Sequence, residues 1–387
     1  MASVEQSLAK RTPDEGRKIK TLCQMLKQRD EETYRRFAET NASSEDQIFT
    51  VVFPTDFKFQ YYRSLDSILI QLQILLCQVG QSYRTDCDIE DYYERLFQRQ
   101  RGSKPLRFDL SRTSFIGDLE LTMIHTLGYF CQKLSCCKIQ TMFNLDKIEW
   151  MSRWNFFEHY DEWGEVGDDV KHMLLYPDTR DSERLIPIRK ISDYSDVDRT
   201  AGELIEAKKI TDLLKKQYGM DGRLIHGFVT DVISEICQNI PEHSKSLGFI
   251  IVHAHPELPD QRIPDIEISI SDCGIGIRQS LLDRYPSRYE NESHHKVIKS
   301  VLEGRFPMPH GQHRGGILRA KDFVGQFGGR IDIRSICAKA GNLSSYDDYD
   351  TPARFWRFFP GTQVRIMIPR LSVASAFDDG KRFLSHE

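Results

Sequence analysis

The sequence feature that most constrains the fold is an alternating strand that runs directly into a glycine-rich turn. Asp265–Ser271 reads DIEISIS, and Asp272-Cys273-Gly274-Ile275-Gly276 follows at once. Alternation of apolar and polar residues with a period of two predicts a β-strand with one face in a core. The glycines allow a tight turn and a close approach to the backbone. An aspartate at this place can accept a hydrogen bond from an exocyclic amine, although an ordinary β-turn explains the same residues.

A polar stripe lies on the helix that we expect over 224–240. Asp231, Glu235 and Asn239 are four residues apart, so they share one side of that helix. The Asn239 amide oxygen suits Mg²⁺, which prefers oxygen ligands. The Glu235 carboxylate can hold or deprotonate a water molecule. A solvated helix face is the plainer interpretation of the same stripe.

Two further glycine-containing segments follow the alternating strand. His310–Gly316 reads HGQHRGG and precedes a helix expected at about 316–327. Free N–H groups at the start of a helix favour an anion, and Arg314 adds positive charge. Pro360-Gly361-Thr362 directly precedes the last expected strand, Gln363–Ile368.

These four segments, in this order, resemble the nucleotide-binding motifs of the GHKL ATPase superfamily of gyrase, histidine kinases and MutL. The resemblance covers about residues 200–370. It implies a Bergerat-type α/β sandwich, in which a mixed sheet has helices on one face and the nucleotide lies between them. It also implies ATP and Mg²⁺ as cofactors, with Glu235 as the general base and Asn239 as the Mg²⁺ ligand. By position, the residues implied in ATP binding are Asn239, His243, Asp272, Gly274, Gly276, Arg314, Gly315, Gly316 and Thr362. Gln312 and Arg314 stand where the superfamily has glycines, which predicts a stiffer phosphate loop.

The N-terminal half alternates between strand and helix patterns. Leu106–Tyr160 resembles the STAS domains of anti-sigma-factor antagonists, which are small α/β units. Those antagonists carry a phosphorylatable hydroxyl at the start of their first helix. Here that place reads Ile116-Gly117-Asp118-Leu119-Glu120, so no phosphoswitch is predicted. A generic α/β interaction domain is the alternative.

The whole chain is therefore expected to be α/β. The predicted order is a charged helical arm (1–47), a STAS-like interaction domain (48–160), an acidic linker (161–195), the ATP-binding domain (196–372) and a tail (373–387). A short strand is expected within the linker at Leu185–Ile191. Two long helices are expected over 197–218 and 224–240, and the stretch from 280 to 312 is expected to be a long polar loop.

The composition excludes several classes of protein. Lys and Arg number 53 and Asp and Glu 57, for a net charge of −4, so bulk charge does not indicate nucleic-acid binding. No apolar run approaches the roughly 18 residues that span a bilayer, and the first residues lack the apolar core of a secretion signal. The nine cysteines form no CxxC pair, which is typical of reduced thiols in a cytoplasmic protein.

The leading functional hypothesis is a Mg-ATP-binding regulatory protein. It would hydrolyse ATP slowly through a water held by Glu235, and lid closure would alter dimerisation or the binding of a protein partner. We expect a homodimer and do not expect membrane association. The alternatives are an anti-sigma-type serine kinase that acts on a STAS partner, and a nucleotide sensor or scaffold without hydrolysis. A two-component histidine kinase needs an acceptor histidine on a dimerising helix, and the helix expected over 197–218 has none.

Overall fold

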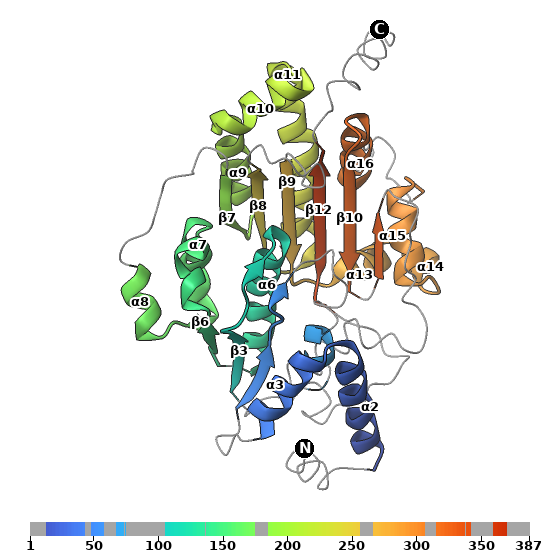
Figure 1. Cartoon of the computed structure of the whole chain (residues 1–387). Coiled ribbons are helices and arrows are strands. Elements are labelled where there is room, and N and C mark those ends of the chain that lie inside the picture. The colour runs from blue at the N-terminus through green and yellow to red at the C-terminus, as the bar shows by residue number, and fades with distance from the viewer. Residues whose placement is uncertain are drawn as a thin grey trace.

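The computed structural model of the chain describes residues 13–42, 48–57, 67–72, 74, 105–135, 137–174, 185–255, 266–305, 315–336, 338–341 and 359–369. Two main sheets, one parallel and one antiparallel, lie one above the other in the view of Figure 1. The expectation of a mixed α/β chain is therefore confirmed at this level.

The N-terminal sheet is parallel. Its strands follow the order β1-β3-β5-β6, and a short parallel pair, β2 with β4, accompanies it. The bounds are β1 (Phe49–Val52), β2 (Asp56–Phe57), β3 (Leu106–Leu110), β4 (Phe115–Ile116), β5 (Ile139–Phe143) and β6 (Gly164–Glu165). Parallel neighbours need a crossover rather than a tight hairpin, and the helix α6 (Asp118–Ser135) makes the crossover from β3 to β5.

The other helices of the N-terminal part are α2 (Pro13–Arg29), α3 (Glu31–Ala42), α7 (Ile148–Arg153), α8 (Asp168–Leu174) and the 3₁₀ turns η1 (Leu145–Lys147), η2 (Phe156–Glu158) and η3 (Tyr160–Glu162). The charged N-terminal segment is helical, as expected. However, Leu22, Leu26 and Phe37 are buried, and Arg36 reaches Asp109 of β3 with N···O at 2.7 Å. This segment therefore packs against the core and does not stand apart as an arm.

The C-terminal sheet has six strands in the order β11-β10-β12-β9-β8-β7. They are β7 (Leu185–Ile191), β8 (Gly248–Ala254), β9 (Ile266–Asp272), β10 (Arg330–Ser335), β11 (Ala338–Gly341) and β12 (Thr362–Ile368). The prediction of a mixed sheet is wrong for these described strands, because every pairing between them is antiparallel. Strands that follow one another in sequence, such as β8 and β9, pair directly, and such neighbours run in opposite directions. The strand expected at Leu185–Ile191 is confirmed as the edge strand β7.

One face of this sheet is covered by a layer of helices. The layer comprises α9 (Tyr194–Glu206), α10 (Lys208–Tyr218), α11 (Gly222–Gly227), η5 (Phe228–Ser234), α12 (Glu235–Asn239), η6 (Ile240–Ser244) and α16 (Gly316–Gln326). The long helix expected over 197–218 is interrupted at Ala207. The second is a continuous column over 222–244 in which η5 and η6 are π-helical, a feature often found at functional sites. We call it the helical column.

The expected polar loop over 280–312 is wrong for its described part. That part forms three helices, α13 (Gly276–Arg284), α14 (Pro286–Tyr289) and α15 (His294–Leu302). The Ser293 side chain caps α15 by accepting from the backbone N–H of Lys296 at 3.3 Å. Val297, Ile298 and Val301 are buried, so a short apolar stripe forms the helix within a polar stretch. Residues 306–312 lie outside the described part.

The other face of the antiparallel sheet is covered by α6, which contacts β8, β9 and β12 and overlaps the lower part of the sheet in Figure 1. The expectation of helices on one face only is therefore also wrong. Several residues of β9 and β12 that face away from the helical layer toward α6 are polar and buried, and we call them the polar seam: Glu267, Ser269, Ser271, Gln363 and Arg365. The Thr126 hydroxyl of α6 lies 3.0 Å from that of Ser271. Neither α6 nor any other described helix has the length and apolar character needed to cross a membrane.

A single histidine of α6 links the two sheets. His125 Nδ1 accepts a hydrogen bond from the Trp163 indole, beside the parallel sheet, at 3.0 Å. The His125 ring stacks on Phe249 of β8 with centroids 4.7 Å apart. Burial lowers the pKa of His125 well below its usual value, so the ring is neutral and can accept from the indole. The two sheets thus share one core around α6.

Candidate functional site

The carboxyl group of Asp272 lies at the end of β9 and is almost fully buried. Its Oδ1 accepts from the Gly274 N–H at 2.8 Å, and its Oδ2 accepts from the Thr362 N–H at 3.2 Å. Burial raises the pKa of Asp272 to about 7, although these backbone donors and the Thr362 hydroxyl oppose the shift. The two carboxyl oxygens have four lone pairs between them and these three donors use three, so one position remains able to accept a further hydrogen bond.

The glycines around Asp272 permit close contacts between protein segments. A Cβ on Gly274 would lie 2.1 Å from the Ser244 carbonyl oxygen, and a Cβ on Gly361 would lie 2.0 Å from that of Asp272. Gly276 has a φ of +77°, and a Cβ there would lie 2.6 Å from Ile336. Gly274 and Gly276 therefore let the turn after β9 fit against neighbouring segments, and the expectation that they shape a base pocket stays a prediction.

A second group of expected residues lies on the helical column. Glu235 and Asn239 are one turn apart, and Asn239 Nδ2 donates to the Glu235 carbonyl oxygen at 2.9 Å. The Asn239 amide oxygen accepts no hydrogen bond from a described residue. The Glu235 carboxylate forms an ion pair with Arg319 of α16, and both side chains are partly exposed. Asp231 lies on η5, but its side chain is outside what the structure describes.

The start of α16 meets the helical column at Glu235. Gly315 is the N-cap residue, and Gly316 is buried so close that a Cβ there would lie 2.7 Å from the Glu235 Cβ. Gly316 therefore lies against Glu235, whereas the ATP-binding role expected for Gly315 and Gly316 stays a prediction. Arg314 and the rest of 306–314, including Gln312, lie outside the described residues.

The end of the helical column joins the two groups. Ser244, the last residue of η6, accepts at its carbonyl oxygen from the Ile275 N–H at 3.0 Å, within the turn that follows Asp272. His243 precedes it and lies 3.5 Å from the Glu242 carboxylate. Burial, with a contribution from Arg284, lowers the pKa of His243, which favours the neutral ring.

Two residues of this site were missed from the sequence. Arg319 pairs with Glu235, and no local pattern reveals that, because the contact depends on how α16 packs on the column. Ser335 Oγ accepts from the Ile277 N–H at 2.9 Å and lies 3.3 Å from the Thr362 hydroxyl, so it ties the turn to β12. Its place at the end of β10 was the only available signal.

Comparisons of the chain with models of protein families, with curated proteins and with solved structures found no match.

Proposed function

We propose that residues 196–372 bind Mg-ATP as a GHKL-type nucleotide domain, and that bound nucleotide regulates the conformation or dimerisation of the protein. The observation that carries this proposal is the buried Asp272 carboxyl, held by two backbone N–H groups at the end of β9. A buried acid with a pKa near neutrality and unused acceptor capacity is more typical of a ligand site than of a structural core. The exocyclic amine of adenine is a donor that suits it.

The residues on the helical column fit the other end of such a ligand. The Asn239 amide oxygen has no partner among the described residues, and Mg²⁺ prefers oxygen ligands. When bound, Mg²⁺ would neutralise phosphate charge and polarise the terminal phosphoryl group. The backbone at Gly315 and Gly316 begins an eleven-residue helix whose free N–H groups favour an anion.

The Glu235–Arg319 ion pair supports slow turnover rather than rapid hydrolysis. A carboxylate that pairs with a guanidinium has to leave it before it can hold a water molecule for attack. Arg319 would thus be a positioning residue that sets how often Glu235 is available. This arrangement suits a switch in which the bound state persists.

Calorimetric titration of the full-length protein with ADP and ATP, with and without Mg²⁺, tests the site. We expect micromolar binding that weakens about 10- to 100-fold in Asp272→Asn, which loses a charged acceptor. Asp198→Asn, at an exposed position on α9, is the matched control and should bind normally. Asn239→Ala should remove the Mg²⁺ dependence. A folded wild-type protein that binds neither nucleotide would overturn the proposal.

Turnover assays separate the remaining hypotheses. A slow ATPase loses turnover in Glu235→Gln but keeps its affinity for ATP. Transfer of the γ-phosphoryl group to a separate STAS protein would instead identify the protein as a serine kinase. ATP binding without any turnover in the wild type would instead identify the protein as a nucleotide sensor.

A further inference from the structure

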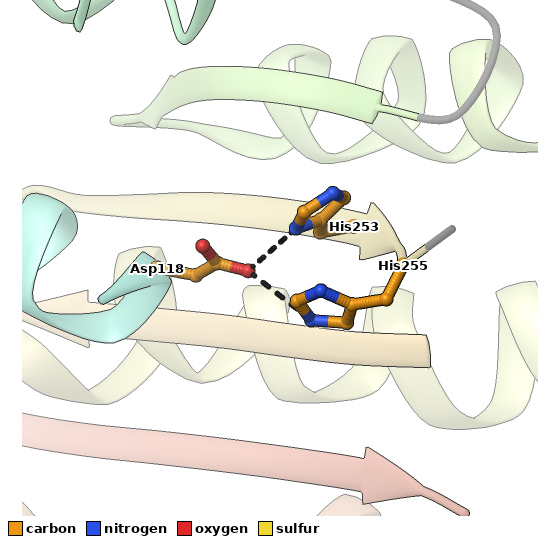
Figure 2. A group of neighbouring side chains, drawn as sticks. All are labelled: Asp118, His253 and His255. Atoms are coloured by element: carbon orange, nitrogen blue, oxygen red, sulfur yellow. Dashed lines mark hydrogen bonds and ion pairs between the residues drawn. The ribbon is translucent and has the colours of Figure 1, made fainter. Parts of the chain in front are cut away.

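A cluster of two histidines and an aspartate lies between α6 and the antiparallel sheet, away from the site described above. His253 is on β8, His255 directly follows β8, and Asp118 begins α6. Figure 2 shows the Asp118 carboxylate pointing toward both imidazole rings. The cluster borders Glu267 of β9, which is five residues and thus about 17 Å along the strand from Asp272.

The pattern of β8 brings the two imidazoles together. Side chains alternate across a strand, so His253 and His255 project to the same side, as Phe249 and Ile251 do toward α6. The two rings lie 4.0 Å apart between centroids. The edge of the His253 ring also packs against Trp154, with centroids 4.8 Å apart, which fixes its orientation.

The donor atoms have nearly the spacing that a metal ion requires. Asp118 Oδ2 lies 3.1 Å from His253 Nδ1 and 3.9 Å from His255 Nε2, and the three donor atoms lie within 4.8 Å of one another. Tetrahedral zinc with bonds of about 2.0–2.2 Å separates its ligand atoms by about 3.4 Å. Closing the cluster around an ion therefore needs only small side-chain movements.

One nitrogen of this cluster lacks a hydrogen-bond partner among the described residues. The bond between His253 and Asp118 is an ordinary one, but His255 Nε2 is buried and has no hydrogen-bond partner among the described residues. A buried polar atom without a partner is costly, and it indicates a missing ligand, ion or water. A purely structural His–Asp pair would not need the second imidazole.

The surrounding charges also favour a cation. Asp118 is buried, and the described residues give it no lysine or arginine within ion-pairing distance. The neighbouring Glu267 is different, since Arg365 binds both of its oxygens at 2.7 Å. Glu267 Oε2 lies 3.8 Å from His255 Nε2, so the paired glutamate can orient that ring from behind. Asp118 thus has two imidazoles, and no basic side chain paired directly with it among the described residues, as its nearest ionic partners.

We propose that Asp118, His253 and His255 bind a divalent transition-metal ion, zinc by their donor set, which fastens α6 to the antiparallel sheet. Two imidazoles and one carboxylate are ligands of zinc and related ions, whereas Mg²⁺ prefers oxygen alone. The ion joins residues more than a hundred positions apart in the sequence, so it stabilises the contact between the two sheets.

The test is zinc binding by full-length protein stripped with a chelator. We expect one equivalent of Zn²⁺ per chain, a raised unfolding temperature, and no such effect of Mg²⁺. His253→Gln combined with His255→Gln should weaken zinc binding at least 100-fold and abolish the thermal shift. His226→Gln, at an exposed histidine of α11, is the matched control. Unchanged zinc affinity in the double variant, or no binding by the wild type, would overturn the proposal.

The nine cysteines could also bind zinc, so the identity of the ligands needs a separate readout. The visible and near-ultraviolet spectrum of the Co²⁺-substituted wild type provides one even if the double variant fails to fold. A d–d spectrum without thiolate charge-transfer bands supports nitrogen and oxygen ligands. Strong thiolate bands at one equivalent of Co²⁺ would contradict the proposed site.

Discussion

At the scale of single residues, two buried acids, Glu267 and Asp272, have pKa values shifted in opposite directions. Glu267 is held by Arg365, and although burial alone would raise its pKa, the nearby His255 ring and the ion pair with Arg365 outweigh burial and hold the pKa below its usual value. Asp272 has only uncharged donors, so burial prevails and its pKa is about 7. Glu267 is therefore held ionised in its ion pair, whereas Asp272 can gain or lose a proton near neutral pH.

Nucleotide affinity should therefore depend on pH through Asp272. The ionised carboxylate is the form that accepts from an amine, and its share falls as the pH drops through about 7. One unit below the pKa about one tenth is ionised, so the dissociation constant at about pH 6 should be roughly tenfold higher than at about pH 8. Titrations in buffers of different ionisation enthalpy should detect proton release on binding. Equal affinity across this range would show that Asp272 does not contact the ligand as an acceptor.

Removing one partner of the Glu267–Arg365 pair should be strongly destabilising. Glu267→Gln leaves a buried guanidinium without its counter-charge, which costs about 3–5 kcal/mol in the free energy of unfolding. Urea unfolding of the metal-free protein measures this cost. Glu149→Gln, which breaks an exposed pair with Arg153, is the control and should change stability little. Similar small effects of both variants would mean that Arg365 finds another partner.

At the scale of elements, the candidate site is assembled from the ends of strands and helices. β9 ends at Asp272, β12 begins at Thr362, α16 begins at Gly316, and the helical column ends at Ser244. The turns between them are so closely packed that several positions have no room for a side chain. The site is consequently held in place by regular elements on every described side.

Gly361 should tolerate no side chain. Its φ is +71°, and a Cβ would overlap the Asp272 carbonyl, whereas Gly219 has a φ of +63° with open space around it. Gly219→Ala should cost about 1–2 kcal/mol from the left-handed backbone alone. Gly361→Ala should cost about 1–3 kcal/mol more because of the overlap. Denaturant unfolding compares the two, and equal costs would mean that the turn relaxes.

The sequence predicts individual elements better than their surroundings. The alternation that predicts β9 is confirmed, but alternation cannot distinguish a polar face in water from one covered by α6. The four-residue stripe places Glu235 beside Asn239 correctly, yet it contains no sign of Arg319. His253 and His255, two residues apart at the end of β8, offer a pair of imidazoles that the sequence shows, whereas only the fold places Asp118 beside them. Short helices such as α15 could not be recognised from the sequence, because four apolar residues among polar ones show only a weak helical periodicity.

At the scale of the whole molecule, α6 makes one core out of two sheets. It packs on the parallel sheet with one side and on the polar seam with the other, and His125 contacts both Trp163 and Phe249. The N-terminal unit therefore serves as the second cover of the antiparallel sheet. A displacement of β9 would be transmitted directly to α6 through the contact between the Ser271 and Thr126 hydroxyls.

The two sheets should unfold together. Phe249→Ala in β8 removes the ring on which His125 stacks, at a cost of about 3–5 kcal/mol. Trp150, Trp154 and Trp163, three of the four tryptophans, belong to the N-terminal unit. Tryptophan fluorescence and far-ultraviolet circular dichroism should show coincident transitions, and both should shift in the variant. A fluorescence transition that stays in place would show two independent units.

The polar residues on the side of α6 that faces the polar seam also have a consequence while the chain is being synthesised. α6 emerges roughly 130 residues before β9, which corresponds to about ten seconds of translation. During that interval its outer side has no sheet to cover it. Asp118, Thr122 and Thr126 on the waiting helix are far less prone to aggregate than leucines would be. Polar side chains on this side of α6, among them the Thr126 hydroxyl that later contacts β9, thus keep the helix compatible with water until the sheet has been synthesised.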